Sequence, residues 1–151
     1  MMLKTHVMFA IFMGLIFINY VSNRFVFIVM LLIATVIPDL DTSSSSYGRH
    51  LIFRPLQAIV SHRGVIHSFT TAVLLSALIA IWWPIASFGF FIGYSTHLIT
   101  DSFTKEGIQP FWPLSWKSNG PLVTGGRIEE ILFIGLIIVN LLLFFGLVVL
   151  S

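Results

Sequence analysis

The side chains that could carry chemistry in this sequence are histidines and carboxylates, and most of them border apolar stretches of the chain. His97 and Asp101 are four residues apart, a spacing that places both on one face of a helix, about one turn apart. An imidazole and a carboxylate so placed can chelate one metal ion, as the two histidines of an HExxH helix do. His62 and His67 are five apart, which suits a regular helix poorly, but Gly64 between them allows a bend.

Two aspartates, Asp39 and Asp41, follow Pro38 at the end of an apolar stretch. The proline predicts extended chain, in which alternate side chains diverge. We therefore expect one aspartate to bind a metal while the other orients a histidine. Arg63, next to His62, is placed to present a fixed cation to a phosphate group.

The candidate ligands are imidazoles and carboxylates, and the chain has no cysteine to add a thiolate. Such a set suits zinc, with manganese or iron(II) as alternatives. Ionisable groups beside apolar segments are costly, and their gathering on one side predicts a functional site. Six residues make up the predicted metal site: His6, Asp39, His62, His67, His97 and Asp101. One tetrahedral ion uses fewer ligands than this, so we expect between one and three ions.

The elements that must position these residues are five apolar stretches, which predict an all-α membrane bundle of four or five short helices in one domain, residues 1–151. The stretches cover residues 7–21, 25–37, 69–83, 85–99 and 131–150, and only the last reaches the roughly 20 residues of a full span. The first four form two tight hairpins. We expect all five to cross the membrane, and we expect the N-terminal stretch not to be a cleaved signal peptide.

Composition agrees with a membrane protein, because 57% of the residues are hydrophobic and only 9% are charged, against about 25% charged in a soluble domain. The net charge of +2 gives no reason to expect a nucleic-acid partner. If all five stretches cross, seven of the eight basic residues lie on the side of the N-terminus and the two long loops. This bias predicts that the metal-site loops are on the cytoplasmic side of the membrane.

Several motifs together resemble the YdjM-like family, whose members are described as LexA-regulated, inner-membrane-associated, metal-dependent hydrolases. The motifs are HRGxxHS from His62, GYxxHxxxDxxTxxG from Gly93, the isolated His6 and the Pro38–Asp41 segment. By this resemblance Glu129 corresponds to the last acidic position of the family. The order of histidines and acids is also similar to zinc-dependent phospholipase C and to single-strand-specific zinc nucleases.

The resemblance implies a membrane-bound hydrolase that cleaves a phosphoester, with a membrane lipid as the expected substrate, by metal-activated water. Asp41 or Glu129 would support the metal or act as the general base, and Arg63 would bind the substrate anion. Two alternatives remain open. A proton- or cation-coupled transporter predicts ionisable groups through mid-membrane, and a non-catalytic scaffold predicts a closed metal site.

Overall fold

In a computed structural model, the backbone is described for residues 1–41 and 65–150, and the side chains of Leu40, Asp41 and Leu150 are not. These residues form an all-helical protein, as predicted, with no β-strand among them. The elements are α1 (Leu3–Phe17), the 3-10 turn η1 (Ile18–Tyr20), α2 (Arg24–Val36), the 3-10 turn η2 (Ile37–Asp41), α4 (Phe69–Ala80), α5 (Pro84–Ser102) and α6 (Arg127–Leu150). His62 and Arg63 lie outside the described residues.

The breaks between helices fall where the sequence predicts them, because each carries a residue that caps or starts a helix. Asn23 accepts a hydrogen bond from the Val26 N–H at 3.1 Å and so caps α2. Ser68 caps α4 in the same way, accepting from the Thr71 N–H at 3.2 Å. Pro84 stands at the first position of α5, where its missing N–H costs nothing.

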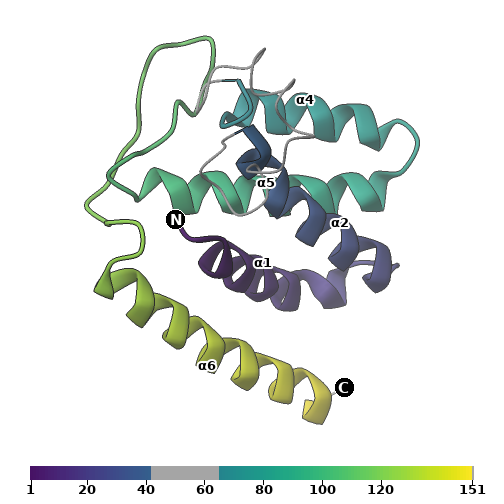
Figure 1. Cartoon of the computed structure of the whole chain (residues 1–151). Coiled ribbons are helices and arrows are strands. Elements are labelled where there is room, and N and C mark those ends of the chain that lie inside the picture. The colour runs from purple at the N-terminus through teal and green to yellow at the C-terminus, as the bar shows by residue number, and fades with distance from the viewer. Residues whose placement is uncertain (42–64, 151) are drawn as a thin grey trace.

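Helix α5 is the centre of the bundle. It lies between α1 and α4, α2 packs across it, and α6 packs on α1 (Figure 1). Most of its side chains are buried, from Ala86 to Asp101. Asn140 joins α6 to α1, since its amide donates to the Met8 carbonyl at 3.0 Å. The central position of α5 explains why its C-terminal end can meet residues from several other elements.

Two glycines bring α5 unusually close to α2. A Cβ atom at Gly89 would lie 2.5 Å from the Phe27 carbonyl oxygen, and one at Gly93 only 2.1 Å from the Leu31 carbonyl oxygen. Residues 89–93 therefore form a GxxxG contact, in which small residues let two helix backbones approach. The contact sets the spacing of the two helices one turn before the predicted metal ligands begin.

The membrane prediction needs one correction of helix length. Two described helical segments are long and apolar enough to cross a membrane, Leu3–Tyr20 with 18 residues and Arg127–Val149 with 23. The first was predicted to be too short for a full span; it is longer because α1 begins at Leu3 and continues through η1. α2 and α4 have only 13 and 12 residues, so five crossings remain a prediction.

The Pro38–Asp41 segment was predicted to be extended, and this is wrong. It forms the 3-10 turn η2, which continues directly from α2. The φ angle that proline imposes also suits the first turn of a helix, so Pro38 does not end the helical path here. As a result Asp39 stays close to the α2 face that contacts α5.

Candidate metal centre

Four parts of the chain bring five predicted site residues to the same end of the bundle. His6 is in the first turns of α1, Asp39 is in η2, and His67 precedes α4. His97 and Asp101 lie near the end of α5. The imidazoles of His6, His67 and His97 are almost fully buried, as is Asp101. The predicted convergence of distant parts of the chain is thus observed for these five residues.

The ligand atoms lie at distances that suit a metal ion. Asp101 Oδ2 is 3.5 Å from His97 Nε2 and 3.7 Å from His67 Nε2, and Asp101 Oδ1 is 3.2 Å from His6 Nε2. Two ligand atoms held about 2.0–2.2 Å from a tetrahedral zinc ion are themselves roughly 3.3–3.6 Å apart. Two groups of three have all their ligand atoms within 4.8 Å of one another: His6, Asp39 and His97, and His67, His97 and Asp101.

His97 belongs to both groups, and its hydrogen bonding fixes which ring nitrogen faces the ligands. Its Nδ1 lies 2.8 Å from the Thr35 carbonyl oxygen, which can only accept, so Nδ1 carries a proton. In the neutral imidazole, Nε2 is therefore unprotonated, and its lone pair can accept a hydrogen bond or bind a metal ion. It has no hydrogen-bond partner among the described residues and faces oxygens of Asp101 and Asp39, the latter at 3.8 Å. Acceptors that face one another in a buried site are stabilised by a cation, and a proton or a metal ion at His97 would supply one besides the Met1 ammonium that pairs with Asp101.

His6 is held in a similar way on the other side of Asp101. Its Nδ1 lies 2.7 Å from the Thr100 hydroxyl oxygen, whose own hydrogen has the helix carbonyls of Thr96 and His97 within reach. The hydroxyl oxygen can thus accept a hydrogen bond from Nδ1–H of His6. Nε2 of His6 is then unprotonated, with its lone pair available to a metal ion. The His6 and His97 rings stack with centroids 3.9 Å apart and planes 11° apart, so both Nε2 atoms face the same region.

His67 is positioned by the segment that begins α4. Ser68 caps the helix and donates through its hydroxyl to the Val65 carbonyl at 2.7 Å. The buried hydroxyl of Tyr94, on α5, donates to the Ile66 carbonyl at 2.6 Å and ties this segment to the central helix. These bonds place the His67 ring 5.5 Å from the His97 ring, centroid to centroid.

The two aspartates differ in their electrostatics. Burial raises the pKa of Asp39, although His97 beside it acts in the opposite direction. Burial alone would also raise the pKa of Asp101, but imidazoles of His6 and His97 that carry the proton at Nε2 outweigh it and lower that pKa. Asp101 is therefore ionised, as a metal ligand must be. The Met1 amino group also pairs with it.

Glu129 lies outside both ligand groups and binds backbone instead. Its two carboxylate oxygens accept the N–H groups of Met2 and Gly125, each at 2.6 Å. The carboxylate therefore joins the start of α6 to the start of α1, the helix that carries His6. The role of Glu129 as general base remains a prediction. The hydrogen bonds that it makes position the start of α1 against the start of α6.

The sequence reasoning missed the residues that aim the ligands. On α5, Gly89, Gly93, His97 and Asp101 follow one another at intervals of four, and on α2 and η2 so do Phe27, Leu31, Thr35 and Asp39. One helix face thus carries first the close backbone contact and then the ligands. The GxxxG pair that ends four residues before His97 could have indicated this close helix contact from the sequence. Asp41 is in η2 with its side chain not described, so its predicted role remains open.

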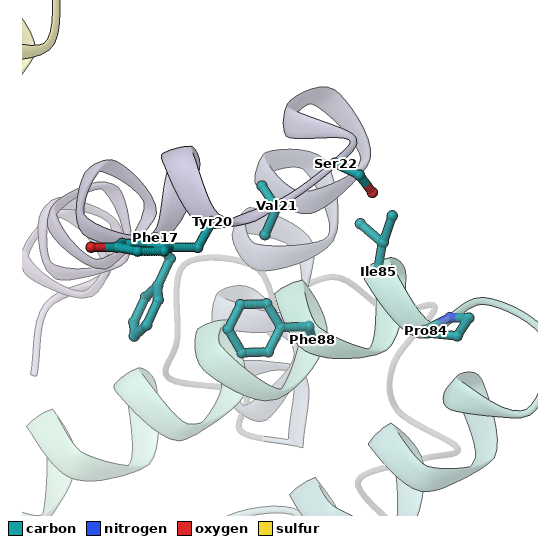
Figure 2. Close-up of a pocket in the computed structure, with 7 residues that line it drawn as sticks. All are labelled: Phe17, Tyr20, Val21, Ser22, Pro84, Ile85 and Phe88. Carbon is teal, nitrogen blue, oxygen red and sulfur yellow. The ribbon is translucent and has the colours of Figure 1, made fainter.

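A hollow of about 570 Å³ lies at the end of the bundle away from the candidate metal centre. Figure 2 shows it between the α1–α2 connection and the start of α5, lined by Phe17, Tyr20 and Phe88 among others. Its residue Pro84 is thirteen residues before His97, about 20 Å along a helix. None of the described residues that line it is a histidine or a carboxylate.

The fold and the histidine–aspartate cluster define a helical membrane protein with a candidate metal centre. Comparison with known proteins agrees: the family described as YdjM inner membrane protein matches residues 1–150, and the chain belongs to this family. The similarity to phospholipase C and to zinc nucleases remains a prediction.

Among curated proteins, the chain is similar to the inner membrane protein YdjM of Escherichia coli K12 and to that of Shigella flexneri. Each is 26% identical in an alignment of 119 positions that covers 71% of this chain and 61% of the relative's length. It is also 26% identical to the uncharacterized protein YvsG of Bacillus subtilis, over 75% of this chain and 74% of YvsG. No solved structure matches this chain.

Proposed function

We propose that this protein is a metal-dependent hydrolase of the inner membrane, which cleaves a phosphoester at the cytoplasmic membrane surface. The observation that supports it most directly is the buried Nε2 lone pair of His97, which faces oxygens of two aspartates. His6, Asp39, His67, His97 and Asp101 would hold the metal, with His62 as a further predicted ligand. Zinc fits this donor set best, with manganese or iron(II) as alternatives.

A bound divalent ion would supply Lewis acidity, which activates water and stabilises negative charge on a phosphoryl oxygen. The residues of the chain would orient the ligands and bind the substrate. Thr35 and Thr100 fix the imidazole tautomers, Glu129 holds α1 against α6, and Arg63 is proposed to bind the phosphate. In the reaction, the oxygen of water bonds to phosphorus, the ester P–O bond breaks, and the departing alcohol takes a proton from water.

The membrane location is supported by the family and by the exposed apolar surface. Helix α6 touches the rest of the bundle chiefly through α1, and large apolar side chains such as Leu142, Phe145 and Val149 are exposed. Continuous apolar surface of this kind requires lipid or another protein against it. The excess of basic residues on the side of the site supports its cytoplasmic placement.

The transporter alternative draws less support from the described residues. Its ionisable groups would have to continue through mid-membrane, yet the buried histidines and acids gather at one end of the helices. Asn140, which interrupts the apolar α6, donates its amide N–H to the Met8 carbonyl, while its Oδ1 has no partner among the described residues. The scaffold alternative predicts a closed metal site without turnover, so an activity assay separates it from the hydrolase.

The test is a direct one. The protein is purified in detergent, its metal content is measured by mass spectrometry, and turnover of methyl p-nitrophenyl phosphate is followed beside His97→Ala. Ser95→Ala is the matched control, since Ser95 is buried in the same helix but outside both ligand groups. We expect bound metal and turnover in the wild type and control, and loss of both in His97→Ala. Metal without turnover would favour the scaffold, and no metal would refute the proposal.

A further inference from the structure

An apolar cavity of about 350 Å³ lies directly beside the candidate metal centre, between α1, α5 and α6. Its apolar lining includes Phe9, Phe12 and Met13 from α1, Ile99 from α5 and Leu132 from α6. The volume is within the range of roughly 300–1,000 Å³ that small-molecule pockets occupy. None of the side chains that line it is charged, and most of them are apolar.

The cavity and the metal centre share a wall. Thr100 lines the cavity, and its hydroxyl oxygen is the partner of His6 Nδ1 at 2.7 Å. Thr96, one turn earlier on α5, also lines the cavity. A ligand that fills the cavity is therefore separated from His6 by the Thr100 side chain alone. This continuity distinguishes it from the larger hollow at the far end of the bundle.

The cavity also borders partly exposed side chains of α5 and α6. Ile99 is 45% exposed and Leu132 is 36% exposed, and they lie on opposite sides of it, on α5 and α6. The other wall is α1, which with α6 provides both candidate spans. A hydrocarbon chain in the bilayer could thus enter sideways between helices without crossing water.

We infer that the substrate is a phosphoester with a hydrocarbon tail, and that this cavity binds the tail while the phosphate lies at the metal centre. The inference rests on the proposed function and specifies its substrate class. The polar and apolar halves of such a molecule match two adjoining parts of the structure, one rich in histidine and carboxylate and one lined by aromatic and aliphatic side chains. Burial of the tail supplies affinity, and the metal centre selects the phosphate.

Binding is tested first, on protein held in amphipol so that no detergent tails compete. Octyl phosphate and methyl phosphate are compared by their effect on the melting temperature of the metal-loaded protein. Because a ligand stabilises the state it binds, we expect octyl phosphate to raise the melting temperature by about 3 °C more than methyl phosphate. Leu132→Trp and Ile99→Trp, which fill the mouth of the cavity from two helices, should abolish this difference.

The matched control is Leu142→Trp, an exposed position of α6 that does not line the cavity. It should keep the difference seen in the wild type. Equal shifts for octyl and methyl phosphate, or an undiminished octyl effect in both cavity variants, would overturn the inference. A parallel assay compares hydrolysis of octyl and methyl p-nitrophenyl phosphate, with at least a tenfold preference expected for the octyl ester. If neither ester is hydrolysed, the result contradicts the proposed function. If both are hydrolysed at equal rates, the result contradicts only the tail-binding site.

Discussion

Replacing Gly93 with alanine tests whether the close contact between α5 and α2 builds the metal centre. The added Cβ would lie 2.1 Å from the Leu31 carbonyl oxygen, whereas real Cβ atoms essentially never approach within 3.0 Å. The two helices would have to move apart by roughly 1 Å, because the obstacle is backbone rather than a flexible side chain. Overpacking of this kind costs about 1–3 kcal/mol.

Helix propensity acts in the opposite direction, since alanine is favoured over glycine in a helix by about 1 kcal/mol. Gly135→Ala on α6 provides the matched control, because a Cβ there would meet nothing within 4 Å among the described residues. The gain in propensity cancels between the two variants. We therefore expect Gly93→Ala to be less stable than Gly135→Ala by about 1–3 kcal/mol in denaturant unfolding.

The same displacement should reach the ligands. His97 is one turn beyond Gly93 and bonds the Thr35 carbonyl, so separation of the helices moves its ring away from Asp39. Disturbing groups that orient ligands typically lowers metal affinity 10- to 100-fold, and we expect at least a tenfold loss in a chelator competition assay. If Gly93→Ala matched Gly135→Ala in both stability and metal affinity, the reasoning would be refuted.

Three further predictions concern hydrogen bonds made by single side chains. Thr100→Val removes the partner of His6 Nδ1 and should weaken metal binding by about tenfold, measured by the same competition; unchanged affinity would mean that Thr100 does not orient the imidazole. Tyr94→Phe removes the bond to the Ile66 carbonyl and should lower the free energy of unfolding by about 1–2 kcal/mol; a change near zero in denaturant titration would contradict this. Glu129→Gln weakens the acceptance of two backbone N–H groups and should cost about 1–3 kcal/mol, whereas Glu130→Gln, at an exposed position next to it, should leave the midpoint unchanged. Equal effects of the two substitutions would remove Glu129 from its positioning role.

The sequence by itself was enough to predict the helices and the meeting of their ends. Apolar stretches with a capping Asn23, a capping Ser68 and a starting Pro84 leave few other local structures. Consecutive helices return to the same side, which is why the sequence alone predicts that His6, His67 and His97 lie at one end of the bundle. The spacing of His97 and Asp101 follows from helical periodicity alone, and the structure confirms it.

Only the tertiary structure decided how the ligands are aimed and what lies beside them. The tautomer of His97 depends on the Thr35 carbonyl, 62 residues away in the chain, and Glu129 holds the N–H of Met2 across 127 residues. The apolar cavity exists only where α1, α5 and α6 meet. Local propensity acts over a few residues, whereas these features arise from packing between elements, whose distances and orientations the sequence pattern of one element does not specify.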